Sequence, residues 1–453
     1  MKKNQLQEAE LYFIDSQFFE AEKLYKKILK TKSVSEEQKA RIYCNLGIIY
    51  SIQGELKKAE AEYLNSLEIN KKLNRQEGLS NIYCNLGVLY SNWGEMEEAE
   101  KMYKQSLEID ENAGKMEGVA GICINLGNIY YIQGKLEEAE ELFNKAATIS
   151  KHLDLIDSLP IIYSNLGSIN LFCGKLGKAE ELFRNAAKIS ENLNNNEALS
   201  SIYASLASVH HKWGNIETAV ELCQRATDIS IKHTIPESEA NSYSVRAEIY
   251  KTQGNYTEAE EFFEKSLELD EKLGKKVGIA DDFCGLASVF TVQGDFVKAE
   301  DFLNKSFEIN KKMENLSGLA ENHYEFANLF KRKQEFDIAE VKYRQALEVA
   351  EKTKDIERKC KCFCELGDLY VLIEDFTIAK DFLDNSLEIN EGCGFKENIA
   401  KTYYYYGNLF LQLFDKKEAL KNYNLSFELF KKLGNKQKTA EIAILLDEVN
   451  NSK

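Results

Sequence analysis

The chain has 453 residues and a formal net charge of −16, from 58 Lys and Arg against 74 Asp and Glu. This acidic balance disfavours direct binding to nucleic acid. The sequence holds no run of 18 apolar residues and no secretory signal near its N-terminus, so we expect a soluble, cytoplasmic protein that does not bind membranes.

Residues 1–40 predict a helix pair that is shorter than the pairs after it. Their small and aromatic residues match those of the next unit at an offset of 38 residues: Ala9, Tyr12, Ala21 and Tyr25 correspond to Gly47, Tyr50, Ala59 and Tyr63. Every later unit has an offset of forty residues, so the first helix of this segment is expected to be clipped.

Residues 41–80 hold the pattern that the rest of the chain repeats. Apolar and small residues at helical spacing predict one helix around Tyr43 to Tyr50 and a second from Leu56 to Ile69. A pair of such helices buries its apolar faces only by stacking on neighbouring pairs.

Three small residues explain how this unit is built. Gly54 lies between the two helices and supplies the positive φ that ends the first of them. Gly47 and Ala59 have no bulky side chain, so the two helices can approach closely while aromatic residues fill the space beside them.

Ten full units follow one another without insertion from residue 41 to residue 433. A fixed period in this range is typical of a solenoid. The last three units replace the glycine between the helices by Gln334, Glu374 and Phe414, so we expect different turns there. Residues 434–453 predict a capping helix and tail, because the charged Asp447 occupies the close-contact position. The predicted organisation is therefore 1–40, 41–433 and 434–453.

The unit resembles the tetratricopeptide repeat family in the spacing of Tyr43, Leu46, Gly47, Tyr50, Ala59, Tyr63 and Ser66. Its length and the absence of a late proline make it similar to the longer repeats of kinesin light chains and of bacterial peptide-sensing regulators. The resemblance covers essentially the whole chain. It implies an all-α fold, a right-handed superhelical solenoid of stacked antiparallel helix pairs with a C-terminal capping helix. It also implies that the first helix of each pair lines a concave groove.

Six positions of each unit would then face the groove, as Arg41, Cys44, Asn45, Ile48, Ser51 and Ile52 do in the first full unit. Among the 24 such positions of the first four full units only Arg41 is charged, where roughly seven charges are expected by chance. The 36 positions of the other six units carry twelve charges: Lys212, Glu248, Lys251, Asp281, Glu321, Glu325, Lys331, Arg332, Lys361, Glu365, Asp368 and Lys401. The sequence thus predicts two surfaces in series, one neutral and one of mixed charge.

The neutral surface contains one asparagine per unit, at Asn45, Asn85, Asn125 and Asn165. A side-chain amide both donates and accepts hydrogen bonds, so this column can pair with the backbone of an extended peptide. The predicted peptide-binding set is completed by Asn128, Ile48, Val88, Ile124, Tyr131, Leu171 and Phe172. The alternative is that each asparagine binds a neighbouring helix or water. The placement of asparagines in the resembled relatives favours the first interpretation.

A second surface is predicted in the mixed half of the groove. Tyr404 and Tyr405 should face the groove beside Tyr324, and exposed tyrosines are effective contact residues. Lys331 and Arg332 lie nearby and could take an acidic side chain of a partner. The alternative is that the tyrosines fill the core.

No pattern of catalytic chemistry is visible. A phosphate-binding loop, a dinucleotide fingerprint and a Cys–His–Asp arrangement are all missing from the sequence, so we predict no enzyme and no cofactor. Cys360 and Cys364 share one helix face while Cys362 points elsewhere, which disfavours a zinc site. The ten cysteines are expected to be reduced thiols.

These observations predict a non-catalytic protein–protein interaction scaffold. It would bind an extended peptide or a partner helix in its concave groove, chiefly through residues 41–200, by burying apolar side chains at many shallow sites. The alternative is a ligand-switched regulator, in which peptide binding changes the superhelix pitch and a second interaction surface around residues 321–410.

Overall fold

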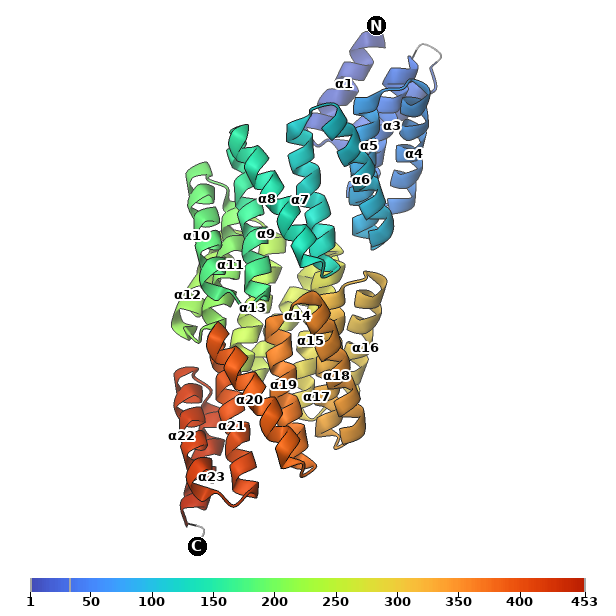
Figure 1. The fold of residues 1–453 in the computed structure, drawn as a ribbon. Coiled ribbons are helices and arrows are strands. Elements are labelled where there is room, and N and C mark those ends of the chain that lie inside the picture. The colour runs from blue at the N-terminus through green and yellow to red at the C-terminus, as the bar shows by residue number, and fades with distance from the viewer. Residues whose placement is uncertain (1, 32–33, 452–453) are drawn as a thin grey trace. The chain divides into compact units, whose positions relative to one another are not determined.

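The computed structural model describes residues 2–31 and 34–451, and all the regular structure in them is helical (Figure 1). A single 3-10 turn, η1 (Ile156–Ser158), accompanies 23 α-helices in these residues. The α-helices are α1 (Lys2–Ile14), α2 (Phe18–Leu29), α3 (Glu36–Ile52), α4 (Leu56–Lys72), α5 (Gln76–Trp93), α6 (Met96–Asn112), α7 (Met116–Ile132), α8 (Leu136–His152), α9 (Leu159–Phe172), α10 (Leu176–Leu193), α11 (Asn196–Lys212), α12 (Ile216–His233), α13 (Pro236–Thr252), α14 (Tyr256–Leu273), α15 (Lys276–Gln293), α16 (Phe296–Lys312), α17 (Leu316–Arg332), α18 (Phe336–Thr353), α19 (Ile356–Leu372), α20 (Phe376–Cys393), α21 (Lys396–Gln412), α22 (Lys416–Lys432) and α23 (Lys436–Asn451).

The helices form a solenoid of antiparallel pairs, as predicted. From α1 to α6, and again from α9 to α23, the two helices of each pair pack together and each pair packs on the next. The first pair is short, with 13 residues in α1 and 12 in α2 against 17 in each of α3 and α4. The chain divides into two compact units: unit 1 comprises residues 1–130 and 141–154, and unit 2 comprises residues 131–140 and 155–453.

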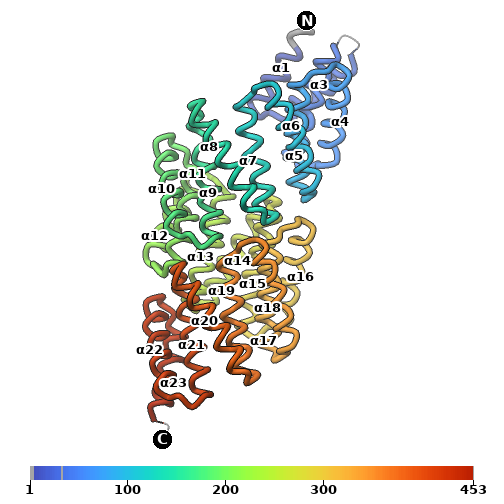
Figure 2. The backbone as a smooth tube through the Cα atoms, in the orientation of Figure 1, coloured from blue at the N-terminus to red at the C-terminus, as the bar shows by residue number. Residues whose placement is uncertain are grey.

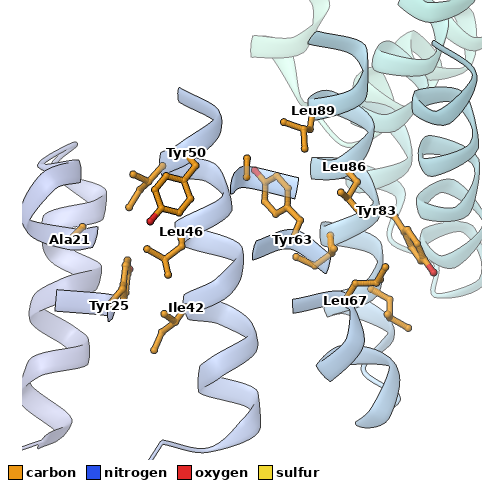
Figure 3. Close-up of a cluster of buried hydrophobic side chains, with 14 of the residues drawn as sticks. Ala21, Tyr25, Ile42, Leu46, Tyr50, Tyr63, Leu67, Tyr83, Leu86 and Leu89 are labelled. Carbon is orange, nitrogen blue, oxygen red and sulfur yellow. The ribbon is translucent and has the colours of Figure 1, made fainter. Parts of the chain in front are cut away.

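Small residues do bring the paired helices together. A Cβ added to Gly47 would lie 2.5 Å from the ring of Tyr63, and one added to Gly87 would lie 2.7 Å from Tyr103. Figure 3 shows Tyr63 entering the space beside α3 while Leu46 and Ile42 point to the other side, toward Tyr25. The aromatic ring thus occupies the volume that a side chain on the glycine would need.

This close packing predicts opposite effects of one substitution at two glycines of unit 2. Gly407→Ala should destabilise the fold by about 2 kcal/mol, because its Cβ would overlap the fully buried ring of Tyr423. Gly392→Ala meets no atom within 4 Å and should stabilise α20 by about 0.5 kcal/mol through helix propensity. Urea unfolding of the two variants beside the parent measures both changes. Equal effects of the two substitutions would contradict the packing argument.

The prediction of different turns in the last three units is wrong. Gln334, Glu374 and Phe414 have φ values of +62°, +65° and +58°, in the same left-handed region as Gly54 at +75°. The hydrogen bonds also agree, since Glu335 N–H donates to Phe330 O at 2.9 Å as Glu55 N–H donates to Tyr50 O. The spacing of the two helices requires this left-handed turn whichever residue occupies it. Gln334, Glu374 and Phe414 therefore adopt a positive φ that is strained for residues with a side chain.

A different constraint keeps glycine in the middle units. In unit 2 the turns at Gly134, Gly174, Gly214 and Gly254 lie against turns that come about 180 to 220 residues later in the chain, so a Cβ there would overlap other atoms. A Cβ on Gly174 would lie 2.8 Å from Cys393 Sγ, and one on Gly214 would lie 2.9 Å from Lys396 Cβ. Figure 2 shows the corresponding approach of α20–α22 to α9–α13 within this unit. We call these turn-to-turn contacts the seam.

Polar contacts reinforce the seam. Asn435 Nδ2 donates to Thr252 O at 2.8 Å, and Thr252 Oγ1 donates to Glu397 Oε2 at 2.7 Å. Lys212 pairs with Glu357 across the same boundary. The ends of α11 and α13 are therefore held directly to the starts of α19 and α21 and to the turn before α23, as well as through the chain between them.

Candidate functional site

A groove with a volume of about 950 Å³ runs along the inner side of unit 2. Its walls are formed mainly by the first helices of successive pairs, α11, α13, α15, α17, α19 and α21, with α23 at one end. Tyr131 and Ile132, at the end of α7, also line it and belong to unit 2. Repetition of the same helix face at every fortieth residue places one strip of side chains per repeat along the groove.

All twelve charges that the sequence places at groove-facing positions of residues 201–440 line this groove. They are Lys212, Glu248, Lys251, Asp281, Glu321, Glu325, Lys331, Arg332, Lys361, Glu365, Asp368 and Lys401. The forty-residue period therefore predicts correctly which charged side chains line the groove of unit 2.

Most of the lysines are paired within the groove wall. Glu357 Oε1 accepts from Lys361 Nζ at 2.8 Å and Glu357 also pairs with Lys212, while Lys401 Nζ lies 2.8 Å from Glu397 Oε1. Burial raises the pKa of Glu357 and Glu397, but the adjacent lysines outweigh burial and hold both pKa values well below the usual range. These carboxylates stay ionised at any physiological pH, so the wall carries fixed, alternating charge.

Lys331 is more enclosed than the other paired lysines of the wall. Its Nζ pairs with Glu365 and lies 2.9 Å from Asp368 Oδ2, and the three side chains are only 9 to 12 % exposed. Burial lowers the pKa of Lys331, but Asp368 and Glu365 outweigh it and raise that pKa well above the usual value. The predicted use of Lys331 for an acidic group of a partner therefore has to compete with two carboxylates of the chain itself.

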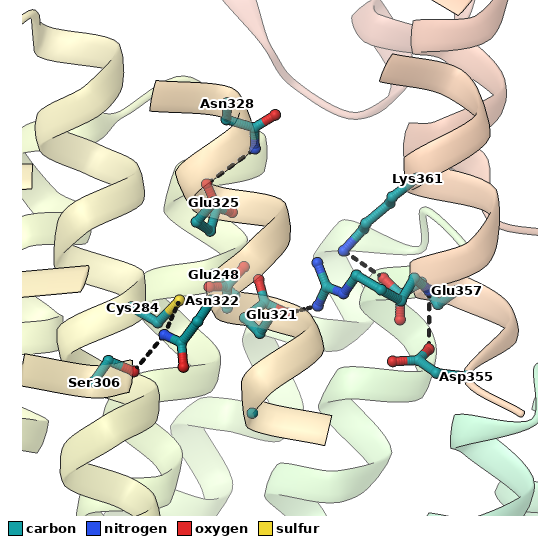
Figure 4. Close-up of polar contacts among 12 residues, drawn as sticks. Glu248, Cys284, Ser306, Glu321, Asn322, Glu325, Asn328, Asp355, Glu357 and Lys361 are labelled. Atoms are coloured by element: carbon teal, nitrogen blue, oxygen red, sulfur yellow. Dashed lines mark hydrogen bonds and ion pairs between the residues drawn. The ribbon is translucent and has the colours of Figure 1, made fainter. Parts of the chain in front are cut away.

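Two other carboxyl groups of the wall, those of Glu325 and Asp281, have a raised pKa. Glu325 is buried, and its Oε2 accepts from Asn328 Nδ2 at 3.0 Å (Figure 4). Burial raises the pKa of Glu325 despite the attraction of Lys251. Asp281 is exposed to the groove, where the surrounding walls, with Asp270 and Glu248, raise its pKa to about 7. The carboxyl groups of Asp281 on α15 and Glu325 on α17 therefore keep their protons to a higher pH than those of Glu357 and Glu397 do.

The predicted second surface lies in the lining of this groove, which contains Tyr324, Lys331, Arg332, Tyr404 and Tyr405. Tyr405 OH donates to Glu365 at 3.1 Å, and Tyr404 OH donates to Glu441 Oε1 at 2.7 Å. Tyr324 is buried beneath the Arg358 guanidinium, which lies 4.8 Å from its ring centroid. Their contact with a partner stays a prediction.

The predicted peptide-binding residues of the first half are distributed over both units. Of the eleven, Tyr131 lines the groove of unit 2, where its ring meets Phe172 edge-on with centroids 6.3 Å apart. Asn165, Leu171 and Phe172 belong to unit 2 and lie outside the groove lining. The other seven belong to unit 1: Asn45, Asn85, Asn125, Asn128, Ile48, Val88 and Ile124.

Three of the asparagines already use their amide donors within unit 1. Asn45 Nδ2 donates to Tyr25 OH at 2.8 Å, and Asn85 Nδ2 donates to Cys44 Sγ at 3.4 Å. Asn125 makes the equivalent bond to Cys84. This is the alternative in which each asparagine binds a neighbouring helix. A peptide could still reach the amide oxygens, so a binding role for the column stays a prediction.

Sequence reasoning missed the groove residues that precede each unit boundary. Glu357, Arg358 and Glu397 lie in the first turns of α19 and α21, outside the six positions considered. Figure 4 shows Glu357 reaching Lys361 on the same helix face. The signal was present in the sequence, because Glu357 and Glu397 stand four residues before Lys361 and Lys401.

Two further observations concern metal binding and membrane crossing. In residues 2–31 and 34–451, no group of three or more His, Cys, Asp and Glu side chains is arranged to hold a metal ion. Over the same ranges, no helix combines the length and the apolar character needed to cross a bilayer.

Comparison with known proteins agrees with the repeat. Three family models match the chain: the MalT-like TPR region over residues 5–198, and two models of the tetratricopeptide repeat over residues 200–231 and 238–312. No curated protein matches it.

Solved structures share the fold. The apo form of the quorum sensor NprR from B. thuringiensis is similar with a TM-score of 0.54 and 18 % identity, over 68 % of this chain and 87 % of that one. The apo form of RapI is similar with a TM-score of 0.51 and 15 % identity, over 61 % of this chain and 98 % of that one.

Proposed function

Because the chain belongs to the tetratricopeptide repeat family, we propose that it is a non-catalytic interaction scaffold that binds an extended peptide or a helix of a partner protein in the groove of unit 2. The observation that carries this proposal is the groove of about 950 Å³ whose walls repeat every forty residues. A volume of this size accommodates a peptide of several residues.

The spacing of polar groups in the groove favours an extended chain. One helix per repeat contributes a polar side chain at the same position: Ser208, Glu248, Ser288, Asn328, Asp368 and Asn408. Neighbouring packed helices are about 10 Å apart, which is the length of about three residues of extended peptide. Donors and acceptors at this interval suit a peptide backbone, while Tyr404, Tyr405 and Tyr131 offer apolar surface between them.

This location differs from the one that sequence reasoning favoured. The sequence favours residues 41–200 because their groove-facing positions are almost all neutral and include one asparagine per unit. The lysine–carboxylate pairs of unit 2 do not exclude a ligand. Their groove-facing atoms can still form hydrogen bonds with a peptide, and the paired side chains are already in position before the peptide binds. We therefore place the principal binding site in unit 2 and keep the asparagine column as a secondary site.

The second candidate function is a ligand-switched regulator. Lys212, Glu357 and Glu397 take part in the seam and also line the groove. A ligand that forms hydrogen bonds or ion pairs with these side chains would change the seam contacts, and the superhelical pitch of unit 2 would change as a result. The shared fold with a quorum sensor supports a regulatory role of this kind.

A peptide-display selection followed by solution affinities tests the proposal. Ser288→Trp should fill the middle of the groove and weaken the selected peptides roughly tenfold or more. The control Leu64→Trp, on the half-exposed outer face of α4, should leave affinity unchanged. If instead Asn85→Ala with Asn125→Ala abolishes binding and Ser288→Trp does not, the site lies on unit 1. Small-angle scattering of the same complexes distinguishes the regulator, which requires a change in dimensions.

A further inference from the structure

The turns at the C-terminal end of unit 2 expose an apolar edge. Leu372 ends α19 and Ile373 follows it, while Leu411 lies in the last turn of α21 and Leu413 and Phe414 follow that helix. Their exposed fractions are 51, 43, 37, 45 and 95 % respectively. We call these five residues the donor edge. The terminal repeats of a solenoid ordinarily present a polar surface to solvent. Five exposed apolar side chains there indicate a surface that another protein covers.

Phe414 makes this edge more unusual. It holds the left-handed turn position with φ of +58°, where Gly54 and its equivalents stand in the earlier units. A bulky residue is strained in that conformation, and its almost complete exposure shows that the ring packs on nothing within the chain. Neither the turn nor the core of unit 2 explains an aromatic ring at this position.

The seam shows what such turns pack against. Inside unit 2 the turns within helix pairs lie on the turns between pairs: Gly134 meets Thr353 and Leu316, and Gly174 meets Ile356 and Cys393. The apolar residues on the receiving side are covered, with Met313 5 % and Leu433 1 % exposed. The donor edge is built from the same kind of turn, three and four repeats beyond the last of these seam turns at Gly254.

Unit 1 displays the receiving surface uncovered. Leu73 and Leu153 are the repeat equivalents of Met313 and Leu433, yet they are each 42 % exposed. Met116, the equivalent of Leu316 and Ile356, is 41 % exposed. We call Leu73, Met116 and Leu153 the acceptor edge.

We propose that the chain associates head-to-tail with a second copy of itself, the donor edge of one copy packing on the acceptor edge of the next. The contact would continue between molecules the turn-on-turn packing that the seam makes within unit 2. Phe414 would then be covered by the partner's Leu153 and Met116. The two edges are different surfaces, so the contact is heterologous and each dimer keeps one free edge of each kind for further copies.

Sedimentation velocity over a wide range of concentration tests this inference on the full chain. The parent should form dimers and larger species with rising concentration. Phe414→Ser and Leu153→Ser should each raise the dissociation constant roughly tenfold or more. Leu64→Ser, a matched loss of a half-exposed leucine on the outer face of α4, should leave it unchanged.

Mixing the two variants gives the sharper result. The Phe414→Ser chain keeps its acceptor edge and the Leu153→Ser chain keeps its donor edge, so a mixture should form a one-to-one complex and nothing larger. Phe414→Gly separates association from folding, because it should weaken association while the melting temperature stays level or rises. A monomer at every concentration, association that neither edge variant weakens, or a mixture without the one-to-one complex would overturn the proposal.

Discussion

Replacing Lys331 with methionine should destabilise the protein by about 3 kcal/mol at neutral pH, as measured by urea unfolding. The substitution keeps the packing of the stem beside the ring of Tyr405 but removes the charge that Glu365 and Asp368 share. Two carboxylates with about a tenth of their surface exposed would then face each other without the lysine that contacts both of them. Removing one member of a buried ion pair costs far more than the pair contributes, because the remaining charge stays poorly solvated.

The pH dependence of this variant provides an internal check. The penalty should shrink as the pH falls toward about 5, because protonating either carboxylate relieves the repulsion. Adding Glu365→Gln and Asp368→Asn to Lys331→Met should recover most of the lost stability at neutral pH. A loss below about 1 kcal/mol, independent of pH, would mean that water screens the group as it does a surface pair.

The period of the sequence determines more of this structure than composition does. A small residue, Gly or Ala, recurs at the Gly47 position of every full unit, and an aromatic residue recurs at the Tyr63 position of most of them. The helix pairing and the groove-facing positions of unit 2 therefore follow once one unit is understood. The same reasoning led to a wrong expectation for the turns at Gln334, Glu374 and Phe414. It treated glycine as a requirement of the turn, whereas in unit 2 glycine is needed where another turn lies on it.

The sequence could not show which charges in the groove pair with one another, because this pairing depends on how the solenoid winds. Lys212 and Glu357 are 145 residues apart, and their pairing results from small rotations summed over several repeats. Without those rotations a list of groove-facing charges cannot say which are already paired. For the same reason Lys331 looked available to a partner, and the asparagine column looked free to offer both its donors and its acceptors.

The core contains a column of polar residues, which is visible only in part from the sequence. The second residue of each full unit is isoleucine from Ile42 to Ile202. It then becomes Ser242, Asp282, Asn322, Cys362 and Thr402, and these five polar or sulfur-containing residues are at most 1 % exposed. In one unit the column is well paired: Asn322 Nδ2 donates to Ser306 Oγ at 2.7 Å, and its Oδ1 accepts from Asn310 Nδ2 at 2.9 Å. Figure 4 shows the Asn322 amide directed at Ser306 and Cys284.

The unit before it holds acids at both amide positions, Asp282 in place of Asn322 and Asp270 in place of Asn310. Asp282 Oδ2 is buried and has no hydrogen-bond partner among the described residues. Burial raises the pKa of Asp282 to about 8, and the nearby Asp270 and Asp281 add to that effect against the opposing bond from Ser266. Burial also raises the pKa of Asp270, to about 6. Asp282 is therefore protonated in the folded chain at neutral pH.

Asp282→Asn should therefore remove a pH-dependent loss of stability. A carboxyl whose folded pKa lies above its unfolded value near 3.8 binds more protons in the fold, so the parent loses stability as the pH rises from about 4 to about 8. The variant has no such proton. Its advantage over the parent should grow from near zero at about pH 4 to on the order of 6 kcal/mol at about pH 9, since one pKa unit corresponds to about 1.4 kcal/mol. Urea unfolding of both proteins across this range measures the difference.

A matched variant and the neighbouring repeat make the result interpretable. Asn322 shows that an amide fits this core position, with the Ser266 hydroxyl standing where Ser306 stands. Asp270→Asn should give a smaller advantage that is complete by about pH 6, because the pKa of Asp270 is raised less. A difference between Asp282→Asn and the parent that stays constant from about pH 4 to about pH 9 would show that Asp282 is ionised throughout, and that the polar column admits water or a counter-charge to the core.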